Sequence, residues 1–172
     1  GGGLTGNTNI TEYITSDGRI TEDVTAESVD KMVELHIPED TIGLNRVGQP
    51  LYYVSAKVQD EPLLPPEQCE VIGLVYNLGP VGATFDPSIN INIEYDESEL
   101  PQGVTEKNLI IGTYSSGDEH WTDLDSLVDP DSNIVTTEVN HFSYFAILAY
   151  TYPASFVLND FSLTNEKIIL GE

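Results

Sequence analysis

Positive charge and cysteine are scarce in this sequence. Six lysine and arginine residues stand against 29 aspartate and glutamate residues, which gives the 172-residue chain a formal net charge of −23. A surface this acidic repels nucleic-acid phosphates and anionic lipids, so we expect no nucleic-acid partner. The single cysteine, Cys69, excludes an internal disulfide and a multi-cysteine metal cluster. We interpret Cys69 as a small buried hydrophobic residue.

Long apolar runs and recognisable catalytic motifs are missing as well. No run approaches the roughly 18 to 20 residues of a membrane helix, so no membrane insertion of this segment is expected. There is no nucleophile elbow, phosphate-cradling loop or dinucleotide fingerprint, which favours a protein that is not an enzyme. The low cysteine count fits the cytosol and a prokaryotic cell surface equally well, but the surplus of acidic residues over lysine favours an extracellular or cell-surface location. The start at Gly1, without Met, predicts a processed product or a piece of a longer protein.

The dominant pattern is alternation of apolar and polar residues, which is unbroken over residues 89–95. This period of two is typical of a strand with one buried and one solvated face. Residues 141–150 are more continuously apolar and predict one central strand that is covered on both faces. Further strands are expected at residues 31–37, 51–58, 70–76, 109–114 and 134–139.

Clusters of Gly, Pro, Asn and Asp separate these strands and predict turns. They fall at residues 16–18, 78–82, 85–87, 115–118 and 129–133. Short strands at this spacing predict an all-β fold, an antiparallel β-sandwich. Helical signal is confined to brief turns expected at residues 96–103, 105–108 and 123–128.

Three sections are expected along the chain. Residues 1–22 are a β-prone N-terminal arm or edge strand, and residues 23–151 are the β-sandwich domain. Residues 152–172 are an apolar, β-prone strand segment. This C-terminal segment is either donated to a neighbouring subunit or is the start of a following domain.

Several stretches of the second half occur in an order that resembles a known family. They are Gly82-Ala83-Thr84-Phe85-Asp86-Pro87, then Trp121, then His141-Phe142-Ser143-Tyr144-Phe145-Ala146. They resemble the β-sandwich domain shared by ankyrins, netrin receptors and zonula occludens proteins, in the form found in archaeal and bacterial cell-surface proteins. Residues 156–171 resemble the first strands of an immunoglobulin-like module. The resemblance implies a non-enzymatic sandwich, in which we expect Trp121 to close one end.

The tripeptide His141-Phe142-Ser143 has a chemical and a structural interpretation. Some members of the resembled family cleave themselves between Phe and Ser. Here Ser143 would be the nucleophile, His141 the base and the Phe142 carbonyl the target. In the structural interpretation, which we favour, His141 and Ser143 share one face of a strand and Phe142 points into the core.

Calcium is the only cofactor that the acidic residues suggest, and the signal is weak. Residues 129–133 begin like a calcium loop, but the sixth position is Ile134 and the twelfth is Asn140, so a hairpin turn is favoured. Charge runs are usually solvated faces. The weak Ca²⁺ candidates are Asp118, Asp123, Asp125, Asp129 and Asp131. The triplet Asn9-Ile10-Thr11 is the only glycosylation-type sequon, and it fits an exposed secreted arm.

The leading functional hypothesis is a non-enzymatic extracellular structural subunit of a prokaryotic, more specifically archaeal, surface layer, sheath or filament. Such a subunit would form a homo-oligomer or polymer by exchanging its terminal strands, because an isolated strand needs a partner for its backbone groups. One alternative is an interaction module that belongs to a longer cell-surface protein. The other is a self-cleaving domain at Phe142-Ser143.

Overall fold

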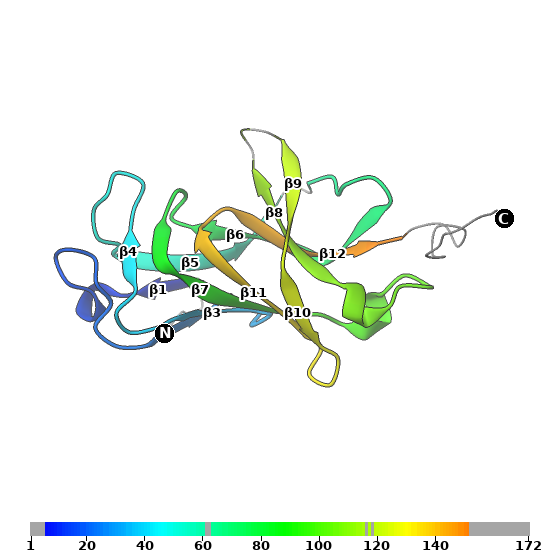
Figure 1. Cartoon of the computed structure of the whole chain (residues 1–172), viewed down its shortest axis with the longest axis horizontal. Helices are drawn as coiled ribbons and strands as arrows, with labels where there is room; N and C mark the ends of the chain where they lie inside the picture. The colour runs from blue at the N-terminus through cyan, green and yellow to red at the C-terminus, as the bar shows by residue number, and fades with distance from the viewer. Residues whose placement is uncertain (1–5, 61–62, 116, 118, 152–172) are drawn as a thin grey trace, which may run out of the picture.

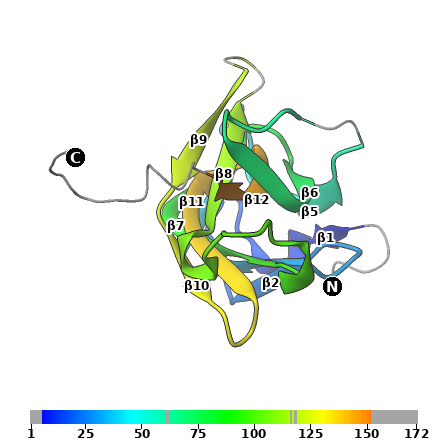
Figure 2. The ribbon, with the colours of Figure 1, turned by 90° about the vertical axis from the view of Figure 1, so that its right-hand side faces the viewer.

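The computed structural model describes residues 6–60, 63–115, 117 and 119–151. Two antiparallel sheets pack face to face (Figures 1 and 2), so the predicted all-β antiparallel sandwich is confirmed. Helical structure among the described residues consists of short 3₁₀ turns, and none of it is long and apolar enough to cross a membrane.

The first sheet contains β12, the strand with the longest run of buried residues. Its strand β12 lies in the middle and is hydrogen-bonded to a neighbour on each side. The order of the first sheet is β1 (Asn7–Asn9), β5 (Tyr53–Val58), β6 (Cys69–Gly79), β12 (Tyr144–Tyr150), β8 (Ile110–Ser115) and β9 (His120–Leu124).

The second sheet is built around β7, the strand that contains the alternating stretch predicted from the sequence. Its order is β10 (Ser126–Asp129), β11 (Ile134–His141), β7 (Thr84–Glu94), β3 (Val33–Ile37) and β2 (Val24–Glu27), with β4 (Ile42–Leu44) paired to the start of β7. The 3₁₀ turns are η2 (Thr11–Tyr13), η3 (Glu97–Glu99) and η4 (Glu106–Asn108). The last two confirm the helical turns expected near residues 97 and 106.

The core lies between the sheets and follows the period of two. Ile89, Ile91 and Ile93 of β7 are at most 2% exposed, whereas Asn90 and Glu94 face solvent. Burying each isoleucine contributes about 1.5–3 kcal/mol relative to leaving it exposed. A shift of the strand by one residue would place these side chains in water, so the alternation fixes the register.

Strand β12 is buried on both faces, as its continuous apolar sequence predicts. Phe145 and Ile147 belong to the core between the sheets. The alternate residues Ala146 and Leu148 are fully buried on the opposite face of the same strand. A second, smaller apolar layer therefore covers the outside of the first sheet.

Trp121 of β9 forms part of this outer layer and does not close an end of the sandwich. A Cβ atom on Gly112 would lie 2.4 Å from Cδ1 of Leu148 and 3.2 Å from Cε3 of Trp121, so these two side chains pack closely over the glycine. The indole Nε1 of Trp121 donates a hydrogen bond of 2.8 Å to the carbonyl of Leu64. The expectation for Trp121 was wrong. The sequence does not show whether an aromatic residue packs on the outer face of a sheet or at the end of the sandwich.

Residues 85–87 were expected to be a turn that stops pairing, and this prediction is wrong. Strand β7 begins at Thr84 and continues through Pro87, because Phe85 and Asp86 pair with β4. On the other side of β7 the ladder with β11 shifts register, and this irregularity accommodates the proline.

Two further expectations were wrong in the same region. Residues 141–150 do not form one strand: β11 ends at His141 in the second sheet, and β12 begins at Tyr144 in the first. Residues 123–128 are not helical, since Asp125 is the corner between β9 and β10. An apolar run fits one long strand as well as two strands that change sheets, and only the packing at the corner distinguishes them.

The N-terminal residues pack against the rest of the sandwich. Strand β1 is the edge strand of the first sheet and pairs with β5. Ile10 and Ile20 are fully buried and belong to the core. The predicted C-terminal strand segment, residues 152–172, lies outside the described residues.

Candidate functional site

The His141-Phe142-Ser143 tripeptide is the corner at which the chain passes from the second sheet to the first. The Phe142 side chain is 2% exposed and its ring centroid lies 4.7 Å from that of Phe85. The backbone N–H of Phe142 donates to the carbonyl of Ala83 at 3.0 Å. Phe142 therefore fastens the corner to the hydrophobic core.

The side chains of His141 and Ser143 contact different partners. The Ser143 hydroxyl donates a hydrogen bond of 2.6 Å to the carbonyl of Tyr114 in β8. The exposed ring of His141 lies 3.1 Å from Oδ1 of Asn140. Over the described residues no hydrogen bond joins His141 to Ser143, so this geometry does not pair a base with a nucleophile.

The calcium candidates are spread along β9, β10 and the following hairpin. Oδ1 of Asp123 accepts a hydrogen bond of 2.7 Å from the hydroxyl of Tyr150. Oδ1 of Asp129 accepts from the backbone N–H of Asp131 at 3.1 Å, as expected for a hairpin turn. Asp118 lies outside the described residues. In the parts of the chain that the structure covers, no group of three His, Cys, Asp or Glu residues could hold a metal ion.

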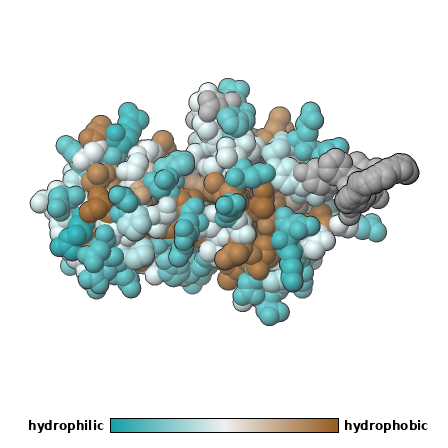
Figure 3. All heavy atoms as spheres, in the orientation of Figure 1, coloured by the Kyte–Doolittle hydropathy of each residue, from teal (hydrophilic) through white to brown (hydrophobic). Residues whose placement is uncertain are grey.

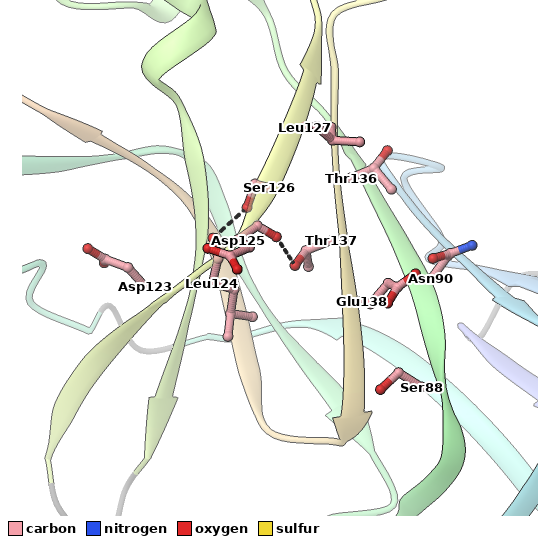
Figure 4. Close-up of a pocket in the computed structure, with 10 residues that line it drawn as sticks. All are labelled: Ser88, Asn90, Asp123, Leu124, Asp125, Ser126, Leu127, Thr136, Thr137 and Glu138. Atoms are coloured by element: carbon pink, nitrogen blue, oxygen red, sulfur yellow. Dashed lines mark hydrogen bonds between the residues drawn. The ribbon is translucent and has the colours of Figure 1, made fainter.

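A polar hollow of about 650 Å³ lies where β9 gives way to β10, beside β7 and β11 (Figure 4). The Asp125 carbonyl accepts a hydrogen bond of 2.7 Å from the Thr137 hydroxyl, which fixes the corner. In Figure 4 the Asp123 side chain points away from Asn90 and Glu138 on the opposite wall. Figure 3 shows hydrophobic residues among the hydrophilic ones over the middle of this face, and Leu127, which lines the hollow, is exposed. Among the residues drawn in Figure 4, the Asp123 carboxylate does not converge with that of Glu138.

Cys69 has no sign of nucleophilic function. Burial, with a smaller effect from the negative charge of Asp123, raises the pKa of its thiol to about 11. The thiol is therefore protonated at neutral pH, and the thiolate that reacts or binds metal is not populated.

An unpaired stretch of strand β6 is a feature that the sequence interpretation missed. Strand β12 pairs with β6 from Cys69 to Asn77, whereas β5 pairs with it only from Tyr76 to Gly79. Residues 69–74 of β6, which we call the β6 edge, thus have β12 on one side and no strand of the described chain on the other. Open backbone groups of this kind accept an added strand.

A groove of about 140 Å³ lies between the two sheets next to the β6 edge. Ile72 and Leu74 of β6 and Ile93 of β7 give it an apolar lining, and Leu74 is 49% exposed. Four acidic residues, Asp30, Glu94, Asp96 and Glu99, stand around it. The β6 edge and this groove together offer hydrogen-bonding groups and a place for apolar side chains, which are what a docking strand requires.

Gly73 is the sequence feature of this edge that the sequence interpretation did not use. It interrupts the apolar pattern of residues 70–76, and it has a φ of +80° with nothing within 4 Å of an added Cβ. A glycine inside a strand pattern indicates a bulge or a close backbone approach. The sequence pattern alone does not tell whether Gly73 marks a bulge, a close backbone approach or only a less stable position in the strand.

Comparison with models of known protein families gave no match, and comparison with curated proteins gave none either.

Proposed function

We propose that the chain is a non-enzymatic, extracellular structural subunit of a prokaryotic surface layer, sheath or filament, of the archaeal kind. The observation that carries the proposal is the β6 edge with its apolar groove. A strand from another subunit would extend the first sheet there and join two sandwiches without any covalent chemistry.

The proposed donor is residues 152–172 of a second copy. The sequence of this segment contains apolar groups around Phe156 and Phe161 and the run Lys167-Ile168-Ile169-Leu170. Apolar side chains on one side of an added strand would enter the groove, and main-chain hydrogen bonds would give the affinity. The carboxylates around the groove would attract Lys167, whereas Asp160, Glu166 and Glu172 of the segment would have to face away from it, so the apolar run 168–170 beside Lys167 is the part expected to dock.

The test compares the assembly of the full chain with that of two matched variants. Leu74→Lys removes an apolar contact of the groove and repels Lys167, so it should abolish concentration-dependent association in sedimentation velocity. Leu127→Lys makes the same change at an exposed leucine of the edge strand β10, away from the groove, and should associate like the wild type. Equal association of the wild type and Leu74→Lys would refute strand exchange at the β6 edge.

A second candidate function is an interaction module within a longer cell-surface protein. It is favoured by the core of the described sandwich, which draws on residues from Ile10 to Ala149, as a module with a hydrophobic core of its own requires. If this candidate holds, the full chain is monomeric at every concentration. Removal of residues 152–172 should then leave the free energy of unfolding of the sandwich unchanged, because in this candidate the segment belongs to the following domain.

A further inference from the structure

The sequon Asn9-Ile10-Thr11 lies where β1 ends and the turn η2 begins. We propose that Asn9 is the attachment site of an N-linked glycan. The proposal depends on one part of the proposed function, namely passage of the chain to the extracellular side. It does not depend on strand exchange.

The triplet presents its two polar side chains to solvent and anchors the residue between them. Asn9 and Thr11 are exposed, whereas Ile10 is fully buried in the core. Strand β1 is the edge strand of the first sheet and pairs only with β5 in the described chain. A glycan on Asn9 would therefore extend into solvent without displacing a core residue.

The hydrogen bonds of the triplet determine which atom of the Asn9 amide is free. Oδ1 accepts from the backbone N–H of Thr11 at 2.9 Å and from the Thr11 hydroxyl at 2.5 Å. A backbone N–H can only donate, so the atom that faces it is the oxygen, and Nδ2 lies on the other side of the amide. Nδ2 has no hydrogen-bond partner in the described part of the chain, and it is the atom that carries the sugar in an N-linked glycan.

The modification is a simple group transfer with a lipid-linked oligosaccharide as donor. Nδ2 of Asn9 attacks the anomeric carbon of the first sugar, and the bond from that carbon to the lipid phosphate oxygen breaks. The lipid phosphate leaves with the bonding electron pair, and a base of the transferase takes one proton from Nδ2. The product is an intact amide with one N–C bond to the sugar.

A hollow of about 370 Å³ beside Asn9 fits the first sugar. It is lined by Asn7, Tyr53, Ser55 and Lys57 as well as by Asn9. Asn9 is opposite Tyr53 in the ladder of β1 and β5. The neighbouring N–H of Ile10 donates to the carbonyl of Tyr52, so Asn9 and Tyr53 form a non-hydrogen-bonded pair, in which side chains are closest.

The Tyr53 side chain is the expected platform for that sugar. Tyr53 is 39% exposed, which leaves part of the ring open to a ligand. The C–H groups of a pyranose pack on an aromatic face, and the hydroxyl and ammonium groups of Ser55 and Lys57 can meet the sugar oxygens. The glycan would also cover the outer edge of β1 and prevent another strand from pairing there.

The test is secretion of the full chain, behind a signal peptide, from a host that N-glycosylates a control protein. Peptide mass spectrometry should find a glycan on Asn9. Asn9→Gln and Thr11→Val should abolish it, whereas Thr11→Ser, which keeps the hydroxyl, and the control Asn140→Gln, at an exposed asparagine of β11 outside the hollow, should retain it. A secreted, folded wild type without a glycan on Asn9, next to a glycosylated control protein, would overturn the proposal.

A second measurement tests the Tyr53 platform. The glycosylated wild type should melt a few degrees above the unglycosylated chain made in a bacterial cytoplasm. In Tyr53→Ser, Asn9 should be glycosylated to the same extent, but the glycan should no longer raise the melting temperature. If the glycan raises the melting temperature of this variant as much as that of the wild type, Tyr53 does not contact the sugar. Sedimentation of the same samples tests strand exchange independently of the glycan. A chain that is glycosylated at Asn9 but stays monomeric would refute the proposed assembly and would support the glycan site.

Discussion

The hydroxyl of Tyr76 in β6 donates a hydrogen bond of 2.7 Å to Oδ2 of Asp30, in the turn between β2 and β3. The bond joins the first sheet to the second beside the groove at the β6 edge. Burial acts to raise the pKa of the Asp30 carboxyl. Hydrogen bonds from the Ser28 hydroxyl, the Met32 N–H and Tyr76 outweigh it, so the pKa lies below its usual value.

Tyr76→Phe should raise the pKa of Asp30 and lower the free energy of unfolding at pH 7 by about 1 kcal/mol, because a part-buried hydrogen bond to the carboxylate is lost. A carboxyl whose pKa is lower in the folded state stabilises the fold above its unfolded pKa, and this stabilisation disappears as the pH falls through the folded pKa. The acid sensitivity due to Asp30 should therefore be weaker in the variant. Carboxyl NMR titration and urea unfolding measure the two effects, with the half-exposed Tyr53→Phe as the control.

The wild-type chain should stay intact at 18.9 kDa in denaturing mass spectrometry, because the Ser143 hydroxyl is bonded to Tyr114 and not to His141. Ser143→Ala should cost about 1 kcal/mol, since the Tyr114 carbonyl loses a donor. The exposed His141→Ala should cost close to nothing. A break after Phe142 that His141→Ala prevents would instead establish the self-cleaving alternative.

Gly82→Ala should destabilise the sandwich more than Gly103→Ala. Both glycines have positive φ, of +85° and +88°, so each substitution carries about 1–2 kcal/mol of backbone strain. A Cβ on Gly82 would also lie 2.7 Å from Cβ of Arg46, whereas the space around Gly103 is open. Chemical unfolding of the two variants measures the difference, and equal losses would show that the contact with Arg46 relaxes without cost.

Calcium should stabilise the chain only as a general screening ion. The carboxylates of Asp123, Asp125, Asp129 and Asp131 do not gather into a binding group in the described structure. With a net charge of −23, added salt of any kind reduces self-repulsion and raises the melting temperature. CaCl₂ and NaCl at equal ionic strength should therefore give equal melting temperatures. A larger rise with CaCl₂ that a chelator reverses would point to a specific site.

The structural features that could be predicted are those that depend on residues close together in the sequence. The alternation of residues 89–95 placed Ile91 in the core and Asn90 in solvent, and residues 129–133 were recognised as a hairpin turn. The corner at Phe142 could not be predicted in this way. Its position depends on the distant Phe85 ring and Ala83 carbonyl, which no pattern within residues 141–150 records.

The β6 edge illustrates the same limit for the candidate site. Which residues of β6 lack a partner depends on where β5 stops and on how the chain returns from Val58 to Cys69. The sequon at Asn9 was visible as a triplet, but its hydrogen bonds to Thr11 and its position opposite Tyr53 come from the pairing of β1 with β5.

The sequence by itself determined the all-β class, the faces of most strands and the strongly acidic surface, because periodicity and charge are properties of neighbouring residues. The tertiary structure decided which strands share a sheet, where the chain changes sheets and which edge stays open. These features depend on contacts between residues far apart in the chain, and several pairings are compatible with the same local pattern.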